Sequence, residues 1–136
     1  MNILFICRHN KFRSKIAEAY FNKINQNENL KAESAGIFQG SYPFSETEMA
    51  IGENLGINIV GKPRAISTDL LRWQDVIIAI TDDLPEGLFN YGTHNYNVIR
   101  WEIKDNYDGD KEEIENIVNE IINRVEEFVK EKENEE

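Results

Sequence analysis

The chain has 136 residues, of which 40% are hydrophobic, a size and composition that fit one globular domain. Its formal net charge of −10 argues against a general affinity for nucleic acid or for anionic membrane surfaces. The single cysteine cannot form an internal disulfide, which suits a reducing compartment. No apolar run is long enough to span a bilayer, and the sequence shows no signal-peptide pattern. We therefore expect a cytoplasmic protein without a membrane partner.

The N-terminal segment combines a strand, a loop and a helix. Residues 3–6 are continuously apolar and predict a buried strand, and a helical pattern begins near Ser14. The loop between them, residues 7–14, reads CRHNKFRS. A helix N-terminus offers unpaired backbone N–H groups and the positive end of its dipole, which attract an oxyanion and favour the Cys7 thiolate over the thiol. Because the Arg13 guanidinium can grip two phosphoryl oxygens at once, the loop suggests attack of sulfur on phosphorus.

The middle of the chain alternates further strands and helices. A short second strand is expected around residues 31–34. Ser45 and Glu48 have the spacing of a capping box, and Gly56 would end the helix that they begin. Residues 76–80 read as a central parallel strand covered on both faces, and residues 97–99 read as a shorter fourth strand.

The last predicted helix has the clearest period. Apolar side chains recur at helical spacing from Ile114 to Val129, with Glu and Lys on the other face. Residues 111–136 contain ten acidic and four basic side chains, so 10 − 4 = 6 of the ten net negative charges lie there. The apolar stripe stops before residue 131, and we expect residues 131–136 to be a frayed acidic end of a single domain that covers residues 1–136.

The alternation of strands and helices predicts an α/β fold, a parallel sheet with helices on both faces. In such sheets ligands bind beyond the carboxyl ends of the strands, which is where Cys7 falls.

At its first loop the sequence resembles the low-molecular-weight protein tyrosine phosphatase family, whose phosphate loop is a Cys, five residues and then Arg-Ser. The segments at residues 33–36, 56–59 and 105–109 resemble further family segments in the expected order. Together they cover most of the chain. The resemblance implies a three-layer α/β/α fold with a four-stranded parallel sheet in the order 2-1-3-4.

The resemblance also implies a mechanism and a set of site residues. Cys7 would be the nucleophile, Arg13 would hold the phosphoryl group and Asp105 would be the general acid and base, with a phosphocysteine intermediate and no metal or cofactor. The substrate would be a phosphorylated protein, most often on tyrosine, or a small phosphomonoester, and the protein would be a monomer or weak homodimer. The other residues expected to bind substrate or shape its loop are Arg8, His9, Asn10, Lys11, Phe12, Ser14 and Tyr107.

Several of these residues have a simpler interpretation. Ser14 could be only the N-cap of the first helix. Carboxylates in polar loops are usually only solvated, and Asp82, Asp83, Asp108 and Asp110 compete with Asp105 for the acid role.

Three departures from the family pattern bear on the site. His9 stands where the family usually has Gly, so either a side chain is accepted there at positive φ or the loop differs slightly. Asn106 replaces the Pro that follows the acid, which is expected to loosen that loop. Arg8, His9 and Lys11 make the phosphate loop unusually cationic, and a phosphoarginine guanidinium, as a cationic leaving group, fits that field poorly.

Three alternative functions stay open at this point. An arsenate reductase of similar fold would need an external thiol, because the chain has no second cysteine. A non-catalytic phosphate-binding module would need neither the thiol nor the acid. An interaction protein could act through the acidic last helix, and this role is compatible with catalysis.

Overall fold

The computed structural model describes residues 1–59, 61–82, 84, 87, 89–91, 94–106 and 109–135. Its main sheet has four parallel strands in the order β2-β1-β3-β6, which confirms the predicted order 2-1-3-4. The strands are β1 (Asn2–Cys7), β2 (Lys31–Gly36), β3 (Val76–Ile80) and β6 (Val98–Trp101). A two-stranded antiparallel ribbon of β4 (Asn90–Tyr91) and β5 (His94–Asn95), which we did not predict, lies outside this sheet.

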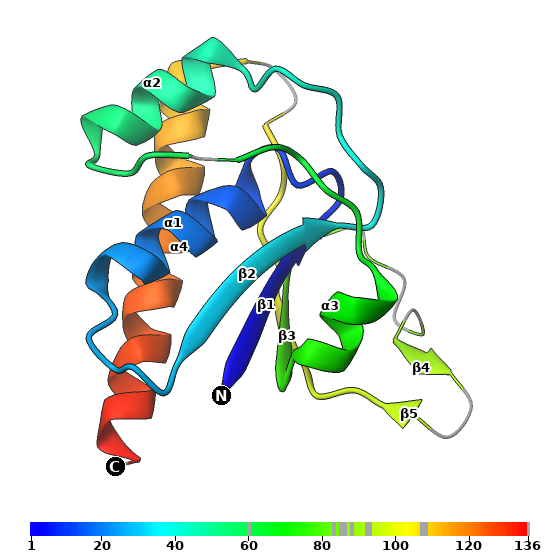
Figure 1. Ribbon diagram of the computed structural model, residues 1–136. Helices are drawn as coiled ribbons and strands as arrows, with labels where there is room; N and C mark the ends of the chain where they lie inside the picture. Colours follow the sequence, from blue (N-terminus) through cyan, green and yellow to red (C-terminus); the bar gives the residue numbers. More distant parts are fainter. Residues whose placement is uncertain are drawn as a thin grey trace.

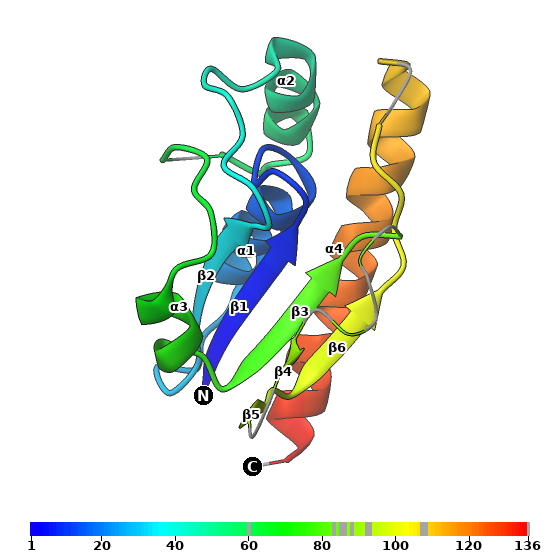
Figure 2. The same ribbon diagram turned by 90° about the vertical axis from the view of Figure 1, so that its right-hand side faces the viewer.

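Helices cover both faces of the sheet, as the alternating pattern predicts. On one face α1 (Arg13–Ile24) and α4 (Lys111–Asn134) pack on Ile3 and Phe5, while α3 (Thr68–Trp73) lies on the face that carries Leu4 and Ile6 (Figures 1 and 2). Alternate side chains of a strand point to opposite faces, so a strand buried on both sides must be apolar throughout. This is why residues 3–6 and 76–80 are continuously apolar, and all of them are buried.

The carboxyl end of the sheet lies at the opposite end of the molecule from both termini, and α2 (Glu46–Asn54) lies beside it (Figure 1). As predicted, Ser45 caps α2 by accepting a hydrogen bond from the backbone N–H of Glu48 at 3.3 Å. Gly56 follows the helix at a φ of 78°, which suits glycine.

One glycine at this end allows the loop after β1 to lie close to β2. Cys7 pairs with Gly36 across the two strands. A Cβ added to Gly36 would lie 2.5 Å from the Phe38 carbonyl oxygen and 2.8 Å from the Asn10 backbone nitrogen. Any larger residue would therefore push the loop away from β2.

The stripe from Ile114 to Val129 packs on the core as predicted, and Tyr20 of α1 donates a hydrogen bond to Glu126 of α4. The helix continues to Asn134, past the end of the apolar stripe. Lys132 accounts for the extension, because its ammonium lies 5.4 Å from the centre of the Phe128 ring and 3.3 Å from the Glu135 carboxylate. Within the part of the chain that the structure describes, none of the helices has an apolar stretch that could cross a membrane.

Candidate active site

The loop after β1 ends in the first turn of α1, and Ser14 lies inside that turn. The N-cap position belongs to Phe12, whose side chain makes no capping hydrogen bond, so the simpler interpretation of Ser14 as the N-cap is wrong. The Ser14 hydroxyl oxygen lies 3.0 Å from the Cys7 sulfur, and both groups are buried. A hydroxyl at this distance can donate a hydrogen bond to a thiolate.

Asn10 is the residue that holds the unusual backbone geometry of the loop. Its φ is +56°, whereas His9 is not among the described residues with a positive φ, so the departure at His9 needs no left-handed backbone. Asn10 is fully buried, and asparagine tolerates this conformation better than most residues. Its side-chain amide donates to the hydroxyls of Ser14 at 2.8 Å and Ser34 at 3.0 Å. Its carbonyl oxygen accepts from the backbone N–H of Arg64 at 3.0 Å.

A polar layer supports the loop from below. Ser34 of β2 donates to the Glu18 carboxylate at 2.7 Å, and the Arg64 Nε donates to the Ser34 carbonyl at 2.8 Å. Burial is the main cause that raises the pKa of Glu18, and the Ser34 hydrogen bond opposes it. Of Glu18, Ser34 and Arg64, only Ser34 lies in a segment that the sequence analysis compared with the family.

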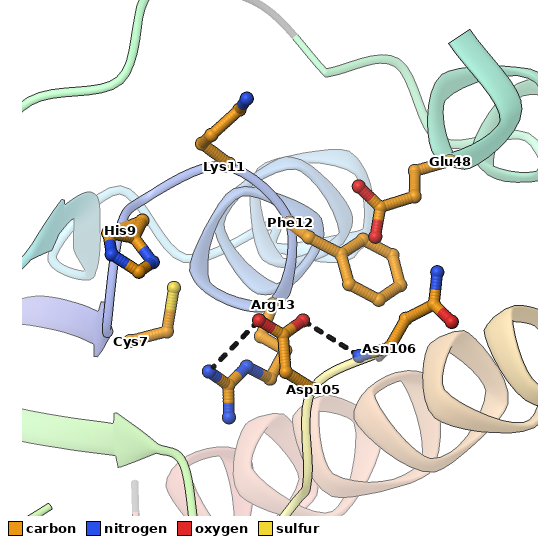
Figure 3. A pocket seen from close by; sticks show the side chains of 8 residues that line it. All are labelled: Cys7, His9, Lys11, Phe12, Arg13, Glu48, Asp105 and Asn106. Atoms are coloured by element: carbon orange, nitrogen blue, oxygen red, sulfur yellow. Dashed lines mark hydrogen bonds and ion pairs between the residues drawn. The ribbon is translucent and has the colours of Figure 1, made fainter. Parts of the chain in front are cut away.

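The guanidinium of Arg13 lies between two carboxylates. Its side chain is 2% exposed, and its Nη1 donates to the Ile103 carbonyl at 2.9 Å. The Asp82 carboxylate lies 3.9 Å from Nη1. The Asp105 carboxylate lies 3.6 Å from Nη2, and Figure 3 shows this pair. A buried cation needs such partners, because burial without them would cost several kcal/mol. Arg13 and Asp105 are thus brought together, as the resemblance implies.

The loop that carries Asp105 is held by short-range hydrogen bonds. The Asp105 carboxylate accepts from the backbone N–H of Asn106 at 2.8 Å, and the Asn106 side-chain oxygen accepts from the N–H of Gly109 at 3.0 Å. The amide of Asn106 therefore makes a turn that proline could not make. Of the competing carboxylates, Asp110 is occupied as the N-cap of α4, with its oxygen 3.0 Å from the Glu112 nitrogen. Asp83, Asp108 and the predicted Tyr107 lie outside the described residues.

These groups surround a pocket of about 160 Å³ (Figure 3). Among the described residues expected to bind substrate, Arg8, Asn10 and Ser14 do not line it, and the buried Asn10 and Ser14 side chains bond to one another and to other buried groups instead. The described residues that line the pocket are Cys7, His9, Lys11, Phe12, Arg13, Glu48, Asp105 and Asn106.

Of the described lining residues, the sequence analysis did not name Asn106 and Glu48 as site residues, and for Glu48 it suggested only a role in the start of a helix. Glu48 is half-buried in the first turn of α2 and reaches towards Phe12 and Asn106 (Figure 3). Burial is the main cause that raises the pKa of Glu48 to about 7, and the nearby Asp105 carboxylate adds to it. The Asn106 hydrogen bond and the Lys11 and Arg13 cations oppose the rise. The sequence alone indicates only that Glu48 has the spacing of a capping-box residue.

Comparison with known proteins identifies the family. Residues 2–136 match the family model described as low molecular weight phosphotyrosine protein phosphatase. The chain belongs to this family. The resemblance seen in the phosphate loop is thereby confirmed over nearly the whole chain.

Members and neighbours of the family show more than one activity. A protein-arginine-phosphatase of Bacillus subtilis is 31% identical over 86 residues, which are 60% of this chain and only 56% of that protein. An arsenate reductase from Archaeoglobus fulgidus is 29% identical, with a TM-score of 0.74 over 93% of this chain and 98% of that chain. A low molecular weight protein tyrosine phosphatase from T. tengcongensis has a TM-score of 0.84 at 20% identity, over 96% of this chain and 99% of that one, and so shows the shared fold.

The geometry brings a thiol, a guanidinium and a carboxylate to one small pocket. Among the described residues, no cluster of three or more His, Cys, Asp or Glu side chains could hold a metal ion. A loop that leads into a helix N-terminus and carries a buried guanidinium suits a phosphoryl group.

Proposed function

We propose that the protein is a phosphomonoester hydrolase that acts on phosphorylated proteins through a phosphocysteine intermediate. The observation that carries this proposal is the convergence of Cys7, Arg13 and Asp105 on one pocket, with the Arg13 and Asp105 side chains 3.6 Å apart. A phosphate-binding module would need neither a thiol nor a carboxylate beside its cation.

The first half of the reaction transfers the phosphoryl group to sulfur. The backbone N–H groups of the loop and Arg13 hold the phosphoryl oxygens, and the Cys7 thiolate attacks phosphorus in line with the leaving oxygen. An S–P bond forms, the P–O bond breaks and its electron pair goes to oxygen. Asp105 gives its proton to that oxygen, so that the product leaves as a neutral alcohol or phenol.

The second half returns the enzyme to its starting state. Asp105, now ionised, takes a proton from a water molecule as that water attacks phosphorus. The S–P bond breaks, inorganic phosphate leaves and the Cys7 thiolate is restored. Two displacements of this kind replace one difficult hydrolysis and need no redox partner.

Two further residues position the reacting groups without touching the substrate. The Ser14 hydroxyl, 3.0 Å from the sulfur, stabilises the thiolate in the free enzyme and as it leaves phosphorus. Asn10 keeps the backbone N–H groups of the loop pointed at the phosphoryl site through its hydrogen bonds to Ser14, Ser34 and Arg64.

Metal-free hydrolysis of p-nitrophenyl phosphate tests this function. With a chelator present, we expect turnover that vanadate inhibits and that disappears in Cys7→Ser. Phosphate binding without turnover by the wild-type protein would instead indicate the non-catalytic module.

A second candidate function is arsenate reduction, which the 29% identity to the Archaeoglobus fulgidus protein favours. With one cysteine in the chain, an external thiol would have to reduce the arsenate adduct formed at Cys7. Arsenite released in proportion to added glutathione or thioredoxin would support this function, and arsenate acting only as a competitive inhibitor of p-nitrophenyl phosphate would exclude it.

A further inference from the structure

The pocket is electrically polarised from one side to the other. Cys7 and His9 lie on one side, and the Glu48 and Asn106 side chains lie on the other, with Asp105 between them (Figure 3). The Arg13 guanidinium lies on the Cys7 side, Lys11 extends from the loop between the two sides, and the described lining beyond Asp105 adds the Glu48 carboxyl group. A phosphoryl group suits the first side, and a cation suits the second.

The direction of the reaction determines which part of a substrate meets Glu48. In an in-line displacement the leaving atom lies opposite the attacking sulfur. The leaving group of a substrate held at Cys7 therefore extends past Asp105, the group that is to protonate it, towards the wall formed by Phe12, Glu48 and Asn106. The Phe12 ring could contact an aryl ring or a planar guanidinium equally well. Glu48 is the described residue on that wall that distinguishes the two by charge.

We propose, building on the phosphatase function above, that Glu48 is a specificity-determining residue that selects phosphoryl groups carried on a guanidinium, as in phosphoarginine, over those carried on a neutral aryl oxygen. The prediction made from the cationic loop alone was the opposite, because it did not include the carboxyl group that α2 brings to the pocket. The phosphoarginine activity of the Bacillus subtilis relative is consistent with this choice.

The reaction with phosphoarginine balances without any further reactant. The Cys7 thiolate attacks phosphorus, the P–N bond breaks and its electron pair goes to nitrogen. Asp105 gives its proton to that nitrogen, so arginine leaves as the guanidinium cation and Asp105 becomes a carboxylate. The leaving group is cationic before and after the step, so an anionic Glu48 favours its binding throughout.

The titration of Glu48 gives the two substrates different pH profiles. Asp105 faces Glu48 as a second carboxylate, Lys11 and Arg13 face it as cations, and the Asn106 amide donates to it. Because the pKa of Glu48 is raised to about 7, its negative charge develops as the pH rises through neutrality. That charge repels the phosphoryl dianion of both substrates, but only in phosphoarginine does a neighbouring guanidinium attract it and offset the repulsion.

The test compares free phosphoarginine with p-nitrophenyl phosphate in the wild-type protein, Glu48→Gln and Glu46→Gln. Glu46 is a matched control, because it lies in the same first turn of α2 but is exposed and does not line the pocket. Loss of a charged hydrogen-bond acceptor is expected to lower kcat/KM for phosphoarginine by about 10- to 100-fold in Glu48→Gln. For p-nitrophenyl phosphate we expect no decrease, and a wild-type decline above about pH 7 that Glu48→Gln removes.

A third variant, Glu48→Asp, keeps the charge and should retain more of the phosphoarginine activity than Glu48→Gln. An equal loss on both substrates, or an equal effect of Glu46→Gln, would overturn the proposal and indicate a structural role for the helix start. If the wild-type protein hydrolyses p-nitrophenyl phosphate but not phosphoarginine, the phosphatase function stands and the proposed selectivity fails. If neither substrate turns over without metal, the phosphatase function itself fails.

Discussion

Replacing Asn10 by alanine should strongly destabilise the phosphate loop. The side chain is fully buried and makes three hydrogen bonds, to Ser14, Ser34 and the Arg64 backbone. At about 1 kcal/mol each, their loss costs about 3 kcal/mol. An alanine at a φ of +56° adds about 1 kcal/mol of backbone strain. The expected loss is about 4 kcal/mol from a total stability that is typically about 5–15 kcal/mol.

Urea denaturation followed by circular dichroism measures this loss, and Asn10→Gly separates its two causes. Glycine removes the same hydrogen bonds but accepts the positive φ, so it should be about 1 kcal/mol more stable than Asn10→Ala. The catalytic activity of both variants should fall well beyond the fraction unfolded, because the backbone N–H groups lose their alignment. A loss below about 1 kcal/mol in Asn10→Ala would show that these hydrogen bonds do not hold the loop.

Three further predictions concern single side chains. Asp105→Asn should lower kcat for a substrate with a poor leaving group by about two to four orders of magnitude. Asp82→Asn also removes an anionic neighbour of Arg13, but it should lower kcat by less than about tenfold. Similar decreases of kcat in the two variants would show that another residue is the acid. The raised pKa of Glu48 means that the folded state holds its proton more tightly than the unfolded state. As the pH rises from about 4.5 to about 7, the free energy of unfolding should therefore fall by about 1 kcal/mol, a figure discounted for solvent screening, and Glu48→Gln should remove that part of the decline in urea titrations at each pH. Tyr20→Phe removes the hydrogen bond to Glu126 that joins α1 to α4, so the free energy of unfolding should fall by about 1 kcal/mol and Tm should fall with it. An unchanged Tm would show that apolar packing alone joins the helices.

Local patterns in the sequence were sufficient to predict the strands of the main sheet and the loop that forms the site, whereas the strand order came from the family resemblance. The apolar runs at residues 3–6 and 76–80 show their burial directly, and a thiol and a guanidinium six residues apart share one strand-loop-helix unit. The short helix α3 was not predicted, because its six residues include no buried one and so leave no clear apolar stripe.

Features that depend on distant segments were not accessible to this reasoning. Asn10 takes the positive φ in place of His9 because its amide bonds Ser34 and Arg64, which only the folded chain brings near. Glu48 enters the pocket because α2 lies beside the carboxyl end of the sheet, whereas in the sequence it is fully explained as part of a helix start. In both cases the local sequence already explains the residue, and contacts with distant segments give it a second role.

The most direct test of the central claim is to trap the covalent intermediate at Cys7. The wild-type protein is mixed with p-nitrophenyl phosphate, quenched within milliseconds, digested and analysed by mass spectrometry. We predict one phosphoryl group on the peptide that contains Cys7, formed in a burst of p-nitrophenol equal to the enzyme concentration when hydrolysis of the intermediate is the slower step. Turnover by Cys7→Ala, or phosphate found on another residue while Cys7 stays unmodified, would contradict the account.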